Sequence, residues 1–377
     1  MSRGPELKLS TKSRVVPVTM ALAGTIALAA CGASNESGNA GGSSANSTAP
    51  QLSGSLNGAG STAQTAAMQG WTAGFSAVQP KVTVNYDAVG SGAGRTQFLA
   101  GGVAFAGSDS PLTDDEVTQA KTRCGTDGVF ELPNYISAIA VVYNLPGVDK
   151  LSLKPDTIAK IFAGSIKKWN DPAIAADNSG AKLPDTAITP VHRSDKSGTT
   201  KNFTDYLSKA APSAWTKASA DTWPFATGEA ANGTSGVVNA VKNGTGTIGY
   251  ADESQAKGLG IADIGVGSTF VAPSPTAAAK VVESSQVMPG RGKYDFAYTI
   301  NRTTTSADEY PIVLVSYHIG CVQNKDKTTA DILKSFEGYV ISPDGQQAAA
   351  KAAGSAPITD AVRAKSQTAV DAITAGA

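Results

Sequence analysis

The chain beyond position 50 alternates between the periods that are typical of strands and of helices. Residues 81–89, KVTVNYDAV, place apolar side chains at alternate positions, which predicts a half-buried strand. Residues 61–75 begin on Ser and Thr, a typical helix start, and predict a helix. The same region predicts strands over 55–60 and 103–109, a loop over 90–94 and a short helix over 95–102. This order of strand, glycine turn, helix and strand indicates βαβ units, so we expect an α/β fold with mainly parallel sheets flanked by helices.

Two long apolar segments, residues 132–144 and 310–322, predict strands that bracket a central block of the chain. The patterns between and after them predict helices over 154–171, 200–210, 235–243, 328–341 and 343–354, and strands over 187–194 and 246–252. We therefore expect a discontinuous first lobe, residues 51–136 and 315–377, and an inserted second lobe, residues 137–314. A cleft is expected between them.

The N-terminus predicts export. A basic head precedes the apolar run from Val15 to Ala30, so residues 1–30 are expected to be a signal peptide; the run is too short to span a membrane comfortably. The run ends in LAAC, which is similar to a bacterial lipobox and predicts a lipid on Cys31; the alternative is an ordinary cleavage site with a chance cysteine. Residues 31–50 are rich in Gly, Ser, Asn and Ala and are expected to form a lipidated flexible tether.

Charge and composition exclude several classes of protein. The 31 basic and 31 acidic residues balance, and removal of residues 1–30 leaves 27 basic and 30 acidic, a net charge of −3. A nucleic-acid-binding protein would carry a basic excess, and any bound anion must instead be held by local groups. The chain has two histidines and no H-E-x-x-H motif, so no metal site is expected. It also lacks the G-x-x-x-x-G-K-[ST] motif of an ATPase.

The two remaining cysteines, Cys124 and Cys321, would meet oxidising conditions in an exported chain. We expect them to form a disulfide, the alternative being two buried thiols.

Three segments combine a strand end, a loop of Gly, Ser and Thr, and a helix start: GAGSTAQ (58–64), GSGAGRTQ (90–97) and SDKSGTTKN (194–202). The first N–H groups of a helix lack partners inside the helix, and the helix dipole is positive there, so each segment could bind an oxyanion. Simple N-capping by Ser or Thr is the commoner explanation for one such segment. Three of them at strand ends favour a shared ligand site.

Charged residues narrow the choice of ligand. Arg193 precedes the third loop and can grip a phosphate or carboxylate with two parallel hydrogen bonds, with Asp195 as its partner. Asp109 ends another strand, where it would repel an anion unless that anion carries a proton. Phosphate is partly protonated near neutral pH and sulfate is not, so a carboxylate among donors selects phosphate. The alternative for Asp109 is a turn or helix-cap residue.

The segments LNGAGSTAQTAAMQGW, VGSGAGRTQFLAGGVAFAGSDSPL and VHRSDKSGTTKNFTDYL, in this order and spacing, resemble the PstS family of phosphate-binding lipoproteins of bacterial ABC transporters. AGSIKKWNDPAI (163–174) is similar to another segment of that family. The resemblance covers the chain beyond the tether. It implies a two-lobed type II periplasmic-binding-protein fold with the ligand in the interlobe cleft. The ligand-binding positions that it implies are Thr62, the N–H of Ala63, Ser91, Asp109, Arg193, Ser197, Gly198 and Thr199, with Ser61 in the same turn and Asp195 beside the arginine.

The same resemblance implies a biological role. The chain would capture inorganic phosphate and deliver it to the membrane permease of an ABC transporter with a cytoplasmic ATPase. It would act as a monomer without a cofactor, held at the outer face of the cell membrane by lipid (palmitate) on Cys31. Ala63 departs from the family, which often has an aromatic residue there, but its N–H is retained.

Two other functions are weighed against phosphate capture. An exported phosphatase or phosphotransferase could use Ser197 or Thr199 as its nucleophile, but the sequence offers no convincing general base or metal ligands. A surface adhesin or sensor would keep the fold and lose the affinity for phosphate.

Overall fold

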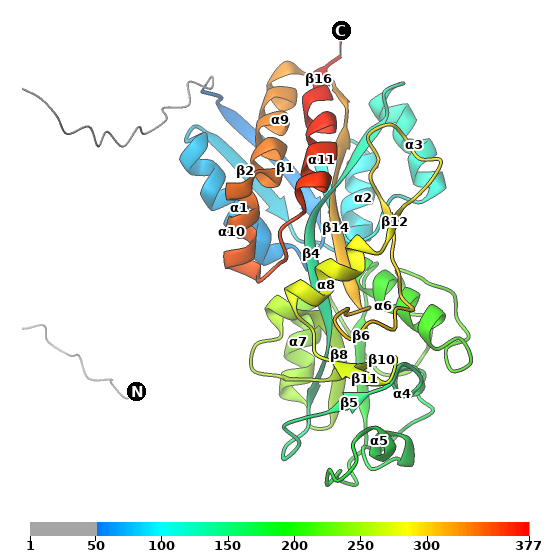
Figure 1. The fold of residues 1–377 in the computed structure, drawn as a ribbon. Helices are drawn as coiled ribbons and strands as arrows, with labels where there is room; N and C mark the ends of the chain where they lie inside the picture. The colour runs from blue at the N-terminus through cyan, green and yellow to red at the C-terminus, as the bar shows by residue number, and fades with distance from the viewer. Residues whose placement is uncertain (1–50, 377) are drawn as a thin grey trace, which may run out of the picture. The chain divides into compact units, whose positions relative to one another are not determined.

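Two long strands, β4 (Val129–Asn144) and β14 (Val313–Cys321), run antiparallel through the middle of the molecule (Figure 1). The computed structural model describes residues 51–376, so the expected signal peptide, Cys31 and tether lie outside the described residues. The first half of β4 pairs with β14 and its second half, Ile139 to Asn144, pairs with β8. Nearly every side chain of both strands is buried, because elements cover both of their faces.

A nine-stranded sheet organises the molecule around these two strands. Its path runs, in spatial order, through β2 (Val82–Asp87), β1 (Gly54–Gly60), β3 (Phe105–Ser108), β14, β4, β8 (Thr247–Asp252), β6 (Thr189–Arg193) and β7 (Glu229–Ala231), and β9 (Gly260–Ile261) pairs with β4. The outer strands pair in parallel, as the βαβ pattern predicts. The central pairs are antiparallel, because β4 carries the chain from one half of the sheet to the other and β14 brings it back. The sheet is therefore mixed rather than mainly parallel.

Helices flank both halves of this sheet (Figure 1). They are α1 (Thr65–Val78), α2 (Ser91–Leu99), α3 (Asp114–Cys124), α4 (Pro155–Phe162), α5 (Pro172–Asp177), α6 (Gly198–Ala210), α7 (Gly233–Asn243), η1 (Glu253–Gln255), α8 (Pro275–Glu283), α9 (Lys327–Ile341), α10 (Pro343–Ala353) and α11 (Asp360–Ala372). The short strands are β5 (Ser152–Leu153), β10 (Asp263–Val266), β11 (Thr269–Val271), β12 (Gln286–Val287), β13 (Tyr298–Thr299), β15 (Gln323–Asn324) and β16 (Thr374–Ala375). No helix within 51–376 has the length and apolarity needed to cross a membrane.

Several helix boundaries differ from those predicted. The helix expected over 61–75 is α1, which begins at Thr65 and ends at Val78. The helix expected over 154–171 ends at Phe162, because Gly164 adopts a left-handed conformation (φ +79°) that turns the chain away from the helix. The loop expected over 90–94 is shorter than predicted, because α2 begins at Ser91 and takes two glycines into its first turns. The errors at α2 and α4 both concern glycines, because glycine can either join the first turn of a helix or end a helix.

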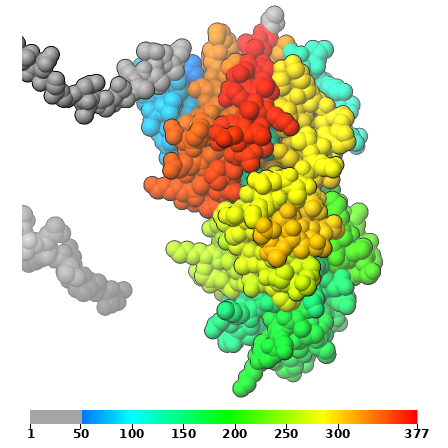
Figure 2. Space-filling view, in the orientation of Figure 1, coloured from blue at the N-terminus to red at the C-terminus, as the bar shows by residue number. Residues whose placement is uncertain are grey.

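We call the side of the sheet with β1, β2 and β3 the first half and the side with β6, β7 and β8 the second half. Aromatic side chains pack each half against its helices. In the first half, Phe75 and Phe105 contact Phe336 of α9, with ring centroids 5.3 and 5.7 Å apart. In the second half, Phe203 of α6 stacks on Tyr250 of β8 at 4.4 Å. Figure 2 shows α10 and α11 on the surface of the first half, and residues near 275–312 over the junction of the two halves.

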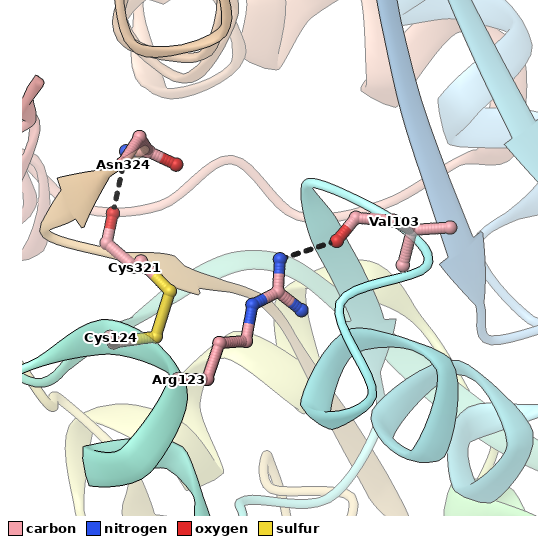
Figure 3. The surroundings of a disulfide bond; sticks show 5 residues. All are labelled: Val103, Arg123, Cys124, Cys321 and Asn324. Carbon is pink, nitrogen blue, oxygen red and sulfur yellow. Dashed lines mark hydrogen bonds between the residues drawn. A yellow bond between two sulfur atoms is a disulfide. The ribbon is translucent and has the colours of Figure 1, made fainter. Parts of the chain in front are cut away.

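A disulfide joins Cys124, at the end of α3, to Cys321, at the end of β14 (Figure 3). The neighbouring Arg123 donates a hydrogen bond to the Val103 carbonyl at 2.6 Å. Its guanidinium lies 4.0 Å above the Phe98 ring. The disulfide therefore attaches α3 to the central strand β14, which pairs with β3.

Candidate functional site

The three glycine turns open onto one place, at the carboxyl ends of β1, β2 and β6. Glycine is needed there because the turns approach one another closely. A Cβ on Gly90 (φ +94°) would lie 2.4 Å from Asp195 Oδ2, and a Cβ on Gly198 would lie 2.6 Å from Ser91 Oγ. Turns that are more than 100 residues apart in the sequence thus contact each other across the junction between the halves of the sheet.

The first turn, between β1 and α1, is held by its own hydroxyls. Ser61 is fully buried, and its Oγ accepts from the N–H of Ala63 at 3.1 Å. Thr62 Oγ1 lies 2.8 Å from Thr234 Oγ1 and accepts from the Thr234 N–H at 3.1 Å. Gln255 donates to the Thr62 carbonyl at 2.9 Å. The turn therefore meets α7 and η1 of the opposite half through direct hydrogen bonds.

Asp109 follows β3 and is 3% exposed. Its carboxylate accepts from Ser316 Oγ at 2.7 Å and from Thr199 Oγ1 at 3.2 Å, while its N–H donates to Ser91 Oγ at 3.1 Å. Burial raises the pKa of the Asp109 carboxyl, and hydrogen bonds from Ser61, Ser316 and Thr199 and the charge of Arg193 oppose that rise. The carboxylate is thus a buried acceptor among donors from both halves.

Arg193 ends β6 and is also buried. Its Nε donates to Asp195 Oδ1 at 2.7 Å, and its second nitrogen pairs with Asp195 Oδ2. Burial alone would raise the pKa of Asp195, but the hydrogen bond and charge of Arg193 and the N–H of Gly233 hold it below its usual value. Asp195 therefore stays ionised and fixes the guanidinium plane.

The third turn places the start of α6 against Ser91 and Asp109. Ser197 is the N-cap, because its Oγ accepts from the Thr200 N–H at 3.2 Å. Behind it, α6 buries Phe203, Tyr206 and Leu207, which stabilises its position by roughly 1.5–3 kcal/mol for each side chain. The start of α6 is therefore held in a fixed position beside Asp109, to which Thr199 Oγ1 donates at 3.2 Å.

The structure brings together all of the phosphate-binding positions that the resemblance implies. They are Ser61, Thr62, Ala63, Ser91, Asp109, Arg193, Ser197, Gly198 and Thr199, with Asp195 beside the arginine. In this structure the Ala63 N–H is engaged by Ser61 Oγ, so the first turn is closed on itself.

Three further residues of this cluster were not predicted from the sequence. Ser316 donates to Asp109, and its signal was the single serine in the apolar strand β14. Thr234 lies in ANGTSG, a fourth Gly and Thr segment before a helix, which repeats the motif of the other three. Asn202, on α6, donates to the carbonyls of Asp109 at 2.6 Å and of Gly198 at 3.0 Å, and no local pattern distinguishes it.

The chemistry of this cluster suits binding rather than catalysis. It offers hydroxyl and N–H donors, one guanidinium and one carboxylate acceptor. Within residues 51–376 no group of three His, Cys, Asp or Glu side chains could hold a metal ion. His192 is not a base for Ser197, because its ring stacks on Trp223 at 5.0 Å and its Nδ1 lies 3.0 Å from the Arg193 carbonyl.

Comparison with known proteins identifies a superfamily and, within it, a family. A PBP superfamily domain matches residues 45–344. The chain is 37% identical to phosphate-binding protein PstS2 of Mycobacterium bovis (strain BCG / Pasteur 1173P2), over 94% of this chain and 97% of that one. It is 38% identical to phosphate-binding protein PstS 3 of Mycobacterium leprae (strain TN), over 84% and 86% of the two chains.

Solved structures share the fold. A high affinity periplasmic phosphate-binding protein, PfluDING, bound with phosphate, superposes with a TM-score of 0.69 at 24% identity, over 84% of this chain and 93% of that one. A phosphate-binding protein from Stenotrophomonas maltophilia gives 0.66 at 19% identity, over 84% and 93%. The chain belongs to the PBP superfamily and, within it, to the PstS family of phosphate-binding proteins.

Proposed function

We propose that this chain captures inorganic phosphate outside the cytoplasm and delivers it to the permease of an ABC transporter. The observation that carries the proposal is the buried Asp109 carboxylate, which faces the donors of α6 and lies near Arg193. A carboxylate is unfavourable in a site for an anion that carries no proton, since like charges repel at short range. An anion that carries a proton can instead donate a hydrogen bond to the carboxylate.

The remaining groups balance the charge of the ligand. Arg193 supplies the one guanidinium, and its partner Asp195 cancels part of that charge. The start of α6 contributes N–H groups and the positive end of a 13-residue helix dipole. Hydroxyls of Thr62, Ser91 and Thr199 complete the set without adding charge. Phosphate would be held by fixed dipoles in a site closed to water.

The binding movement is a closure of two lobes, residues 51–136 with 315–377 and residues 137–314. The proposal is supported by β4 and β14, the two central strands that connect the halves, and by the hydrogen bonds that cross the junction. The segment from β12 to β13 departs from this division, because Asp295 pairs with Glu131 in the first half of β4. Closure of this kind buries a ligand between lobes.

The chain would work as a monomer at the outer face of the membrane. A signal peptide over residues 1–30, a lipid on Cys31 and the tether that follows would keep the binding domain close to the permease. The relatives are named phosphate-binding proteins, which supports binding over an exported phosphatase.

Calorimetric titration of the purified protein tests the proposal. We expect one phosphate per chain, with sulfate at least about a hundredfold weaker, as expected when a buried acceptor is left facing an unprotonated anion. An absence of heat with phosphate, or equal affinity for the two anions, would contradict it. Release of p-nitrophenol from its phosphate ester by the same preparation, at a rate that Ser197→Ala abolishes, would favour the enzyme instead.

A further inference from the structure

Arg95 is a buried cation beside the site that the family resemblance does not include. It lies on α2, four residues after Ser91, and its side chain is 4% exposed. Its Nε donates to both carboxylate oxygens of Glu116 at 3.0 and 3.1 Å. One terminal nitrogen donates to Ser108 Oγ and to Ser110 Oγ, at 3.2 and 2.9 Å, on either side of Asp109. Within its own half of the molecule, the guanidinium therefore supports the Asp109 loop.

The other terminal nitrogen of Arg95 crosses to the opposite half. It donates to Asp221 Oδ2 at 3.1 Å, and the Asp221 side chain is 27% exposed. The backbone carbonyl of Asp221 accepts from the Ser197 N–H at 2.8 Å. Arg95 thus links the Asp109 loop with the segment that holds the start of α6.

The partners of Arg95 make this link reversible. If the halves separate, Arg95 loses Asp221 but keeps Glu116 and two serine hydroxyls, so its charge stays paired. Asp221 is partly exposed already and can be solvated by water. The ion pair therefore favours the closed state without leaving an unpaired buried charge in the open state, which would cost several kcal/mol.

We propose that Arg95 is a positioning residue that latches the closed cleft through Asp221 and slows the release of phosphate. The latch rests on the proposed function, in which the two halves open and close around phosphate. Because it forms only on closure, it acts on the rate of opening. It does not touch the ligand, so it leaves the choice between phosphate and sulfate unchanged.

Asp221→Ala is the direct test, because it removes the carboxylate and keeps the backbone carbonyl that Ser197 uses. We expect phosphate release, followed by stopped-flow fluorescence, to be about fivefold faster, with the association rate within about twofold, as for loss of a partly exposed ion pair. Raising the salt concentration from about 0.05 to about 0.5 M should speed release from the wild type and not from the variant. Asp221→Glu should restore slow release in part.

Asp185→Asn is the matched control, since Asp185 forms an ion pair with Lys168 on the surface, at 2.7 Å. It should leave release unchanged. A readout without ligand separates the latch from the proposed function: hydrogen exchange of residues 195–200 should be faster in phosphate-free Asp221→Ala than in the wild type. Unchanged release and unchanged exchange would overturn the latch. A wild type that binds no phosphate would instead overturn the proposed function, and hydrogen exchange alone would then decide whether Arg95 holds the halves together.

Discussion

In the function that we propose, one side chain, Asp109, decides between phosphate and sulfate. It is buried, it accepts from hydroxyls on β14 and α6, and its N–H is fixed by Ser91. These bonds fix the position of the carboxylate in this structure. A fixed acceptor cannot turn away from an unprotonated anion, so its repulsion is unavoidable.

Asp109→Asn is expected to reduce discrimination against sulfate by about tenfold or more, because an amide can donate to an unprotonated oxygen and carries no charge. Calorimetric titrations of both anions measure the ratio of affinities. Asp149→Asn, at an exposed position, is the control and should keep the wild-type ratio. A ratio that survives in Asp109→Asn would show that the carboxylate does not choose the ligand.

Arg193→Lys should weaken phosphate binding by about tenfold or more, although the positive charge is kept. An ammonium cannot bond to both oxygens of Asp195 and still present a fixed face to the ligand. Arg193→Ala should weaken binding further. Equal affinities of the lysine variant and the wild type would mean that charge alone matters at this position.

A short element, η1, also helps to position the site. Asp252 ends β8, and its carboxylate accepts from Tyr135 Oη at 3.0 Å and from the Ser254 N–H at 3.0 Å, which caps η1. Gln255, at the end of η1, reaches the Thr62 carbonyl. One turn of 3₁₀-helix therefore connects the central sheet to the first glycine turn.

Asp252 also predicts a pH dependence of stability. Burial raises its pKa to about 7 against the hydrogen bonds that it accepts, so between about pH 4 and pH 7 the folded chain holds a proton that the unfolded chain releases. Stability should therefore fall as the pH rises through this window, by up to about 4 kcal/mol from this group. Asp252→Asn mimics the protonated form and should lack this loss.

Urea unfolding of the wild type and of Asp252→Asn at pH 5 and pH 8 checks this pH dependence. The free energy of unfolding of Asp252→Asn relative to the wild type should increase with pH. A constant difference between the two proteins would place the pKa of Asp252 near its ordinary value.

Helices, strands and the three glycine turns could be predicted from the sequence better than the contacts between them. The alternating segment 81–89 and the Gly, Ser and Thr turns are local signals, and each marks its element. The ends of α2 and α4 were misplaced, because glycine can either join a first helical turn or end a helix. Ser316 and Asn202 were missed because their roles depend on partners 207 and 93 residues away. Local patterns carry no information about such distant pairs.

At the scale of the whole molecule, the disulfide connects parts of the chain that are 197 residues apart. It closes a loop that contains the entire second half of the sheet. Cys321 lies five residues from Ser316 along β14, or about 16 Å. The bond should therefore act on the folding of the chain and not on the ligand.

Replacing both Cys124 and Cys321 by Ser should lower the free energy of unfolding by about 5 kcal/mol, since the unfolded chain regains the freedom of a long loop. Phosphate affinity should stay within about twofold. Thermal and urea unfolding of the variant, beside the wild type with and without reductant, measure the change. Equal stability of the oxidised and reduced proteins would contradict it.

The central claim is that donors from both halves of the molecule and one carboxylate enclose a protonated tetrahedral anion. A crystal structure of the protein with phosphate tests it most directly. We expect a single anion bonded to Arg193, to the first turn of α6 and to the hydroxyls of Thr62 and Ser91, with one phosphate oxygen in hydrogen-bond contact with Asp109. Phosphate bound elsewhere, or bound with Asp109 turned away from it, would contradict the account.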